Sequence, residues 1–232
     1  MTSRNLPVLL VTGILAVPAA LLGHSARSAE TAVVLPPPTA DLKGHGVQKL
    51  VVAGGCFWGV QAVFQHVKGV TSAVSGYAGG SAKAANYTAV STGRTGHAEA
   101  VEITYDPSVV SAGTLLRVFF SVAHDPTEHD RQGPDVGTQY RSGVFPGDAA
   151  QANFVASYVS ELEAAKAFRA KIVTKIEPQQ TFYPAETYHQ DYLTRHPNNP
   201  YIVFNDRPKL EALKTTFPEL YRPDPKLVAS GS

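Results

Sequence analysis

Apolar and polar positions follow two different periods along this chain, and the changes of period mark its secondary structure. An apolar run at 50–53 ends at two glycines, as expected for a buried strand. Apolar residues then recur at helical spacing over 57–67, and period-two alternation covers 97–105. By the same criteria we predict strands over 70–77, 139–145 and 172–176, and helices over 111–124, 148–168, 186–193 and 207–215.

The order of these elements predicts the fold class. Residues 47–145 follow the order β-α-β-β-α-β, which is the split βαβ (ferredoxin-like) arrangement of an antiparallel or mixed sheet with packed helices. We therefore expect a single α+β domain over 47–220. Its two long polar loops cover 81–96 and 125–138. We also expect the protein to be a monomer.

The ends of the chain differ in composition from this domain. Arg4 precedes residues 6–22, which carry no charge, and small residues follow, so we predict an export signal over 1–29 and a periplasmic mature protein. A retained leader would instead anchor the protein to the membrane. Residues 30–46 are rich in proline and glycine and predict an unpacked linker, and 221–232 predict a flexible tail.

Charge and cysteine usage narrow the possible functions. The chain has 20 Lys and Arg residues against 19 Asp and Glu residues, so it lacks the basic excess typical of nucleic-acid binding. Cys56 is the only cysteine. Exported proteins often pair their cysteines in disulfides, which a single cysteine cannot do within one chain. Cys56 is therefore a packing residue, an intermolecular link or a reactive thiol.

The residues around Cys56 favour the reactive thiol. Cys56 lies where the first strand turns into the first helix, and a helix N-terminus favours the thiolate, so we expect a lowered pKa. Gly55 lets the backbone approach a ligand closely. Phe57 and Trp58 can form an apolar wall around the sulfur. The alternative is an inert buried cysteine with Trp58 as an ordinary core residue.

Glu99 is the candidate acid. In the strand over 97–105 it shares its parity with Val101 and Ile103, so we expect it to face the core, where burial raises the pKa of a carboxyl group. A carboxyl group that is neutral at pH 7 can donate a proton. The alternative is that Ala98 and Ala100 face the core and Glu99 is solvated.

Other polar residues are weaker candidates. Tyr87 and Tyr140 could supply phenolic donors, although a buried tyrosine more often only packs. His189 and Asp191 could orient a ligand, or could lie on a surface helix. A metal site would draw on His124, His129, Asp130 and Asp135, but they show no repeated ligand spacing, so we expect no metal.

Six ordered blocks of residues resemble the type A peptide methionine sulfoxide reductase family over roughly 48–205. They are Gly-Gly-Cys-Phe-Trp-Gly (54–59), Gly-Tyr-Ala-Gly-Gly (76–80), Thr-Gly-His-Ala-Glu-Ala-Val (95–101), His-Asp-Pro (124–126), Arg-Gln-Gly-Pro-Asp-Val-Gly-Thr-Gln-Tyr-Arg-Ser (131–142) and Pro-Ala-Glu-Thr-Tyr-His-Gln-Asp-Tyr (184–192). One block alone would be only suggestive, whereas six in order are specific.

The resemblance implies roles for individual residues. Cys56 resembles the nucleophile, whose attack on the sulfoxide sulfur gives methionine and a cysteine sulfenic acid. Glu99 resembles the acid that protonates the sulfoxide oxygen. Tyr87 and Tyr140 resemble the hydroxyl groups that hydrogen-bond this oxygen, and Asp135 resembles a residue that helps to bind substrate and order the site.

The resemblance also implies a substrate. Phe57 and Trp58 resemble the apolar pocket for the S-methyl group, and Gly55 and His189 are further candidates for substrate binding. The family acts on the S epimer of methionine sulfoxide, free or in proteins, and so repairs oxidative damage. No cofactor is implied.

The chain departs from many family members because it has no second cysteine to resolve the sulfenic acid. Ser91 lies where some relatives have one. We therefore expect an external thiol to reduce Cys56, from a thioredoxin-like protein, a glutaredoxin or a small thiol. Two rival functions are a cysteine hydrolase, with His97 or His189 as base, and a redox sensor that does not release methionine.

Overall fold

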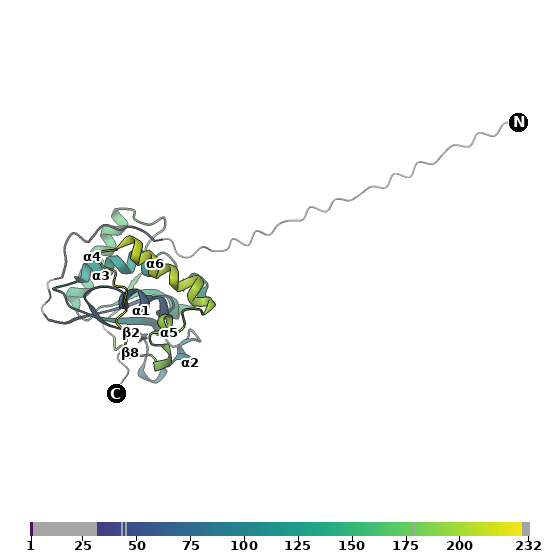
Figure 1. The fold of residues 1–232 in the computed structure, drawn as a ribbon, viewed down its shortest axis with the longest axis horizontal. Coiled ribbons are helices and arrows are strands. Elements are labelled where there is room, and N and C mark those ends of the chain that lie inside the picture. Colours follow the sequence, from purple (N-terminus) through teal and green to yellow (C-terminus); the bar gives the residue numbers. More distant parts are fainter. Residues whose placement is uncertain (2–31, 43, 45, 179, 229–232) are drawn as a thin grey trace.

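The structure is a computed structural model that describes Met1 and residues 32–228, apart from 43, 45 and 179 (Figure 1). The predicted leader over 1–29, Met1 aside, lies outside the described residues. Within the part of the chain that is described, no helix combines the length and apolar character needed to cross a membrane.

The described residues form one mixed sheet with the strand order β7-β6-β1-β3-β2-β8. Its strands are β1 (Gln48–Gly54), β2 (Val70–Ala78), β3 (Ala98–Tyr105), β6 (Ser142–Phe145), β7 (Lys175–Ile176) and β8 (Tyr183–Pro184). Strand β3 lies between β1 and β2 and is antiparallel to both, which is the predicted split βαβ arrangement. A separate two-stranded hairpin joins β4 (Arg131–Gln132) to β5 (Asp135–Val136).

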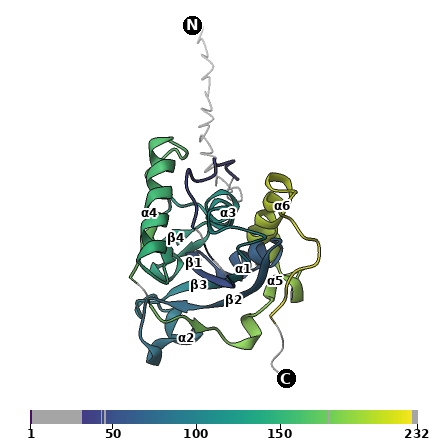
Figure 2. The same cartoon turned by 90° about the vertical axis from the view of Figure 1, so that its left-hand side faces the viewer.

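Helices cover one face of this sheet, where α1, α3, α4 and α6 lie together in Figure 2. The α-helices are α1 (Phe57–Gln65), α2 (Tyr87–Val90), α3 (Ala112–Val118), α4 (Ala149–Ala164), α5 (Tyr192–Arg195) and α6 (Arg207–Thr216). The main core joins this layer to the sheet, with Phe64 and Leu116 from the helices against Val52 and Val101 from the strands. Burying such side chains contributes roughly 1.5–3 kcal/mol each. The predicted α+β class is confirmed.

Short turns of tighter or wider helix extend or interrupt the predicted elements. Among the described residues, the π-helical turns are η2 (Phe119–Ala123) and η5 (Ile202–Asp206), and the 3₁₀-helical turns are η1 (Ala82–Ala84), η3 (Thr138–Tyr140) and η4 (Thr187–His189). The predicted helix over 186–193 is wrong, because Asp191 takes the left-handed conformation (φ 58°) and separates η4 from α5. Helix α4 ends four residues before the predicted residue 168, and Lys166 lies beyond it with φ 50°.

The expectation of an unpacked linker over 30–46 is wrong for the segment 33–41. Leu35 is buried in the core, and the Tyr158 hydroxyl donates a hydrogen bond to the Pro36 carbonyl over 2.7 Å. The Asp41 carboxylate accepts from the Gly113 N–H at the start of α3, over 2.9 Å. An apolar side chain and a capping carboxylate thus hold this proline-rich segment on the helices.

Part of the predicted flexible tail over 221–232 is hydrogen-bonded to the domain, and residues 229–232 lie outside the described residues. The backbone N–H groups of Arg222 and Lys226 donate to the carbonyls of His66 and Gln65 over 2.8 and 2.9 Å. These carbonyls lie at the C-terminus of α1 and have no intrahelical partner. The tail therefore completes the hydrogen bonding of the helix that carries the candidate nucleophile at its other end.

Candidate functional site

Cys56 is the N-cap residue of α1 and lies one residue beyond Gly55, which joins α1 to β1. Its side chain is 8% exposed. Gly55 has φ 86°, and a Cβ there would lie 2.6 Å from Cβ of Gln132. Any other residue would be strained in the backbone and would collide with the hairpin. The turn that presents the thiol therefore requires glycine on two grounds.

The expected lowering of the Cys56 pKa is wrong. Burial raises the pKa of the Cys56 thiol well above its usual value, and the charges of Asp206, Glu99 and Asp135 raise it further. A backbone hydrogen bond from Trp58, in the first turn of α1, acts in the opposite direction and is outweighed. Without substrate, Cys56 is therefore a protonated thiol.

Glu99 is buried, as the alternation along β3 predicted, and is 2% exposed. Ala98 and Ala100 are buried as well, against the other face of the sheet, so β3 has no solvated face at this point. Glu99 Oε2 accepts a hydrogen bond from the Phe57 N–H over 3.0 Å. Burial raises the pKa of Glu99 to about 8, although the Phe57 hydrogen bond opposes the shift. The Glu99 carboxyl group therefore holds a proton, and it is bound to the N–H of the residue that follows Cys56.

Phenolic hydroxyl groups complete the polar side of the site. Burial raises the pKa of Tyr87 and of Tyr140, and the charge of Glu99 is the second largest cause. The charge of Cys56 also raises both pKa values. Both phenols therefore stay protonated and can donate hydrogen bonds. Tyr87 begins α2, whose first N–H donates to Glu186 Oε1 over 2.9 Å. Tyr140 ends η3.

Asp135 lies on β5 and accepts a hydrogen bond at Oδ2 from the Tyr201 hydroxyl group. Burial raises the pKa of Asp135, while the Tyr201 hydrogen bond and the charge of Lys209 lower it. Sequence reasoning missed both Tyr201 and the nearby Asp206. The apolar run over 201–204 resembles an ordinary core segment. Tyr201 contacts Asp135, a residue distant in sequence, so no local signal identified Tyr201 or Asp206.

Aromatic side chains form the apolar side of the site around Trp58. The Trp58 ring stacks on Tyr192, with ring centroids 3.7 Å apart, and meets Tyr201 edge-on at 5.9 Å. The indole N–H donates to His189 Nδ1 over 3.1 Å. The Phe57 ring also packs against His189, with ring centroids 5.1 Å apart. These contacts join the side chains of Phe57 and Trp58, the two residues after Cys56, in one aromatic cluster.

His189 is buried, so the reading of a surface helix for His189 and Asp191 is wrong. Burial lowers the pKa of His189, and the ring is neutral. Because Nδ1 accepts the Trp58 hydrogen bond, the proton lies on Nε2. This Nε2 atom is buried and has no hydrogen-bond partner among the described residues. His189 therefore holds a buried N–H donor beside Trp58 and Phe57.

The buried side chain of Asp191 fixes the segment that carries His189. Its Oδ1 accepts from Gln65 Nε2 over 2.7 Å and from the Val228 N–H over 3.0 Å, while its own N–H donates to Gln61 Oε1 over 2.9 Å. Both glutamines lie on α1. Helix α1, whose N-cap residue is Cys56, thus also sets the position of the His189 donor.

Other candidate residues have different roles. His97 Nδ1 accepts from the Gly80 N–H and its Nε2 donates to the Ser81 carbonyl, so neither nitrogen can serve as a base for Cys56. His129 and Asp130 pair with each other at 3.4 Å on the loop. Within the described part of the chain, no group of three or more His, Cys, Asp or Glu side chains could hold a metal ion.

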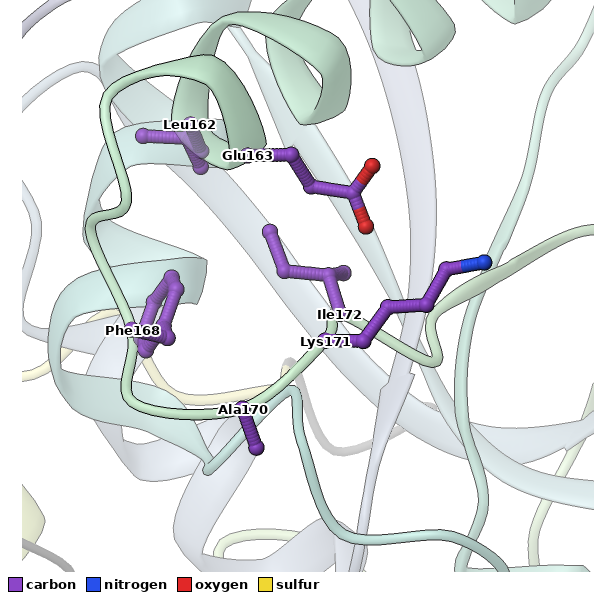
Figure 3. A pocket seen from close by; sticks show the side chains of 6 residues that line it. All are labelled: Leu162, Glu163, Phe168, Ala170, Lys171 and Ile172. Atoms are coloured by element: carbon purple, nitrogen blue, oxygen red, sulfur yellow. The ribbon is translucent and has the colours of Figure 1, made fainter.

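A surface pocket of about 310 Å³ lies beyond the C-terminus of α4. Figure 3 shows the Glu163 and Lys171 side chains among those that line it, extending toward the same side. Its lining residues are Leu162, Glu163, Phe168, Ala170, Lys171 and Ile172. None of them belongs to the candidate site around Cys56, so this pocket does not extend the site.

The fold and the site define a class: an α+β enzyme with one buried thiol, a protonated carboxyl group bound to the N–H of the following residue, and an aromatic cluster that begins at that residue. Residues 48–220 match the peptide methionine sulfoxide reductase family, and the chain belongs to this family. It is an oxidoreductase that reduces methionine sulfoxide.

Individual relatives agree with this assignment. The chain is 59% identical over 187 residues to the peptide methionine sulfoxide reductase MsrA 2 of Mesorhizobium japonicum, covering 81% of this chain and 96% of that protein. The reduced form of Mxr1 from Saccharomyces cerevisiae superposes with a TM-score of 0.61 at 34% identity, covering 69% of this chain and 92% of that one. Methionine sulfoxide reductase A of Corynebacterium diphtheriae gives 0.56 at 36% identity, covering 74% and 88%.

Proposed function

We propose that Cys56 and Glu99 together carry out the reduction of the S epimer of methionine sulfoxide. The observation that supports this most directly is the Phe57 N–H bond to Glu99, which holds a protonated carboxyl group beside the buried thiol. A sulfoxide is a poor electrophile until its oxygen is protonated. Glu99 supplies that proton, and Cys56 Sγ attacks the sulfur.

The reaction balances without a cofactor. Attack forms a bond between Cys56 Sγ and the sulfoxide sulfur, and Glu99, having given its proton to the oxygen, takes the thiol proton. The protonated oxygen then moves from the substrate sulfur to Sγ, so that the sulfoxide S–O bond and the new sulfur–sulfur bond break and an S–O bond forms on Cys56. The products are methionine, in which sulfur is reduced, and a Cys56 sulfenic acid, in which sulfur is oxidised. Tyr87 and Tyr140 donate hydrogen bonds to the sulfoxide oxygen as charge develops on it.

The two sides of the site explain the choice of one epimer. The oxygen is held on the polar side, by Glu99 and the two tyrosines. The S-methyl group then packs on the apolar side, against the Trp58 ring held by Tyr192. The third substituent, which is the rest of the methionine residue, points out of the site. An R-epimer substrate would exchange oxygen and methyl and leave buried donors unpaired.

Recycling requires a thiol from outside the chain, because Cys56 is the only cysteine. A first external thiol condenses with the sulfenic acid and releases water, giving a mixed disulfide. A second thiol then attacks this disulfide and restores Cys56. The reductant is a thioredoxin-like protein, a glutaredoxin or a small thiol, and trapping the mixed disulfide with each would identify it.

A single turnover without reductant tests the proposal. The reduced protein is mixed with excess S-epimer methionine sulfoxide, quenched, and analysed for methionine and for the mass of the Cys56 peptide. We expect about one methionine per protein and one oxygen gained at Cys56. Cys56→Ser, the matched control, should give neither. Absence of methionine in a folded wild-type protein would overturn the reductase function, and ester turnover without reductant would support the hydrolase.

We also propose that the predicted leader directs the protein to the periplasm, where the mature domain acts as a monomer. The charge-free run at 6–22 after Arg4 supports export. Cell fractionation with mass determination of the mature N-terminus tests the localisation. Recovery of the full-length chain in the membrane fraction would favour a retained anchor, and size-exclusion chromatography tests the monomer.

A further inference from the structure

Asp206 is an acidic residue of the site that has no role in the proposed reaction. It ends the π-helical turn η5, is the N-cap residue of α6, and is 1% exposed. Aspartate at this position normally caps its own helix, but its side chain makes no capping hydrogen bond to α6. The second residue of α6 is Pro208, which has no N–H to offer.

The Asp206 carboxyl group lies instead against the first turn of α1. A Cβ added to Gly59 would collide with Asp206 Oδ1 and lie only 2.8 Å from its Cγ. Gly59 is the third residue of α1, one turn from Cys56. Glycine at this position therefore leaves the space that the Asp206 carboxyl group occupies.

This position brings a third carboxyl group to the thiol. Besides burial, the charge of Asp206 is the largest influence that raises the pKa of Cys56, ahead of Glu99 and Asp135, and it also acts on Glu99 and Tyr201. The titratable and charged groups around the thiol are Glu99 from β3, Asp135 from β5, Asp206 from η5, Tyr87 from α2, Tyr140 from η3, Tyr201 before η5, His189 from η4 and Lys209 from α6, which acts on Asp135.

We propose that Asp206 is a positioning residue that, packed on Gly59, keeps both Cys56 and Glu99 protonated before substrate binds. This inference rests on the proposed function, because the reaction needs a proton on Glu99 and gains from a thiol that is inert to other oxidants. The thiolate, and not the thiol, is the form that peroxides and alkylating agents attack. A protonated Cys56 is therefore spared until a sulfoxide enters the site.

The test measures thiol ionisation and activity separately. In Asp206→Asn the carboxylate charge is lost and the shape is kept. We expect the alkylation rate of Cys56 by iodoacetamide near neutral pH to rise by on the order of threefold to tenfold, the size expected for removing one charge near a buried thiol. The pH profile of kcat/KM should move to lower pH as a whole, because both groups lose their protons earlier.

Two further variants make the test decisive. Asp148→Asn, at the N-cap of α4, is a matched control that changes another aspartate and should leave the alkylation profile unchanged. Gly59→Ala displaces the Asp206 carboxyl group by contact and should shift the profile in the same direction as Asp206→Asn. An unchanged alkylation profile in folded Asp206→Asn, or a uniform loss of activity at all pH values, would overturn the proposal.

Alkylation needs no sulfoxide, so it distinguishes this inference from the proposed function. If the wild-type protein forms no methionine, the proposed function fails whatever the alkylation shows. If the wild type forms methionine and Asp206→Asn alkylates at the wild-type rate, only the role of Asp206 fails.

Discussion

The backbone N–H of Phe57 donates to Glu99 Oε2 over 3.0 Å, and this bond joins the helix of the nucleophile to the central strand β3. Phe57 is the first residue of α1, so its N–H has no partner within the helix. A buried carboxyl group takes that position and, with its pKa raised to about 8, is mostly protonated at neutral pH. One side chain thus orients the helix and stores a proton beside Cys56.

Replacing Glu99 by glutamine should remove the acid while keeping an oxygen for the Phe57 N–H. We expect kcat/KM for the S epimer to fall by roughly 10²- to 10⁴-fold at neutral pH, the usual contribution of a general acid. In the wild type, activity should fall as the pH rises through about 8, because the protonated form of Glu99 is lost. That limb of the pH profile should be missing in Glu99→Gln.

The measurement is kcat/KM against pH for both proteins, with substrate binding followed by calorimetry in a Cys56→Ser background. Similar binding by both proteins would confirm that the Glu99→Gln substitution does not distort the pocket. If the limb near pH 8 persists in Glu99→Gln, or if its rate equals that of the wild type, Glu99 is not the acid.

The same shift makes the stability of the domain depend on pH. The pKa of Glu99 rises from about 4.3 in an unfolded chain to about 8 in the folded protein. Between these values the folded state binds more protons than the unfolded state, so the free energy of unfolding falls as the pH rises. Urea unfolding of the wild type and Glu99→Gln across this window should show the variant gaining stability relative to the wild type. Parallel curves would contradict the raised pKa.

Local sequence patterns predicted the central elements of the fold and two residues of the site. The apolar run before Gly54 and the alternation along β3 depend only on neighbouring residues, and burial of Glu99 follows from its parity with Val101. The turn at Cys56 was predictable for the same reason, since a strand, two glycines and a helix follow one another directly. Such features need no knowledge of the rest of the chain.

The ionisation of Cys56 could not be predicted in this way. Three carboxyl groups reach it from β3, β5 and η5, and their convergence exists only in the folded protein. The sequence pattern identified only the helix N-terminus, whose effect is smaller than that of burial. Tyr201 and Asp206 were missed for a related reason, because Tyr201 contacts β5 and Asp206 contacts α1, and no local pattern records these long-range contacts.

The C-terminal segment should stabilise the site although it contains none of its residues. Deleting residues 223–232 removes the hydrogen bonds of Lys226 with Gln65 and of Val228 with Asp191. The Asp191 carboxylate then loses one of its buried donors, and we expect a loss of about 1–3 kcal/mol in the free energy of unfolding. Because Asp191 fixes the His189 segment, KM should rise more than kcat falls.

Deleting only residues 229–232 is the matched control, because both hydrogen bonds are kept. Thermal unfolding and steady-state kinetics of the two truncations would measure the difference. Equal stability and equal KM in the two proteins would show that the segment 223–228 contributes nothing to the site.

Gly55, in the turn before Cys56, should tolerate no side chain. A comparison with Gly133 separates the cost of its backbone conformation from the cost of the collision with Gln132. Gly55 has φ 86° and a Cβ there would lie 2.6 Å from Gln132, whereas Gly133 has φ 53° and has nothing within 4 Å of a Cβ. Gly133→Ala should therefore cost only the backbone preference, about 1–2 kcal/mol. Gly55→Ala should lose the same amount and a further ~1–3 kcal/mol of unfolding free energy from the collision, and should move Cys56 relative to Glu99.

Urea unfolding measures the two losses in the free energy of unfolding, and the methionine yield of a single turnover reports whether Cys56 is still correctly placed. Equal costs for the two variants, with full turnover in Gly55→Ala, would show that the hairpin does not pack rigidly on the turn that presents the thiol.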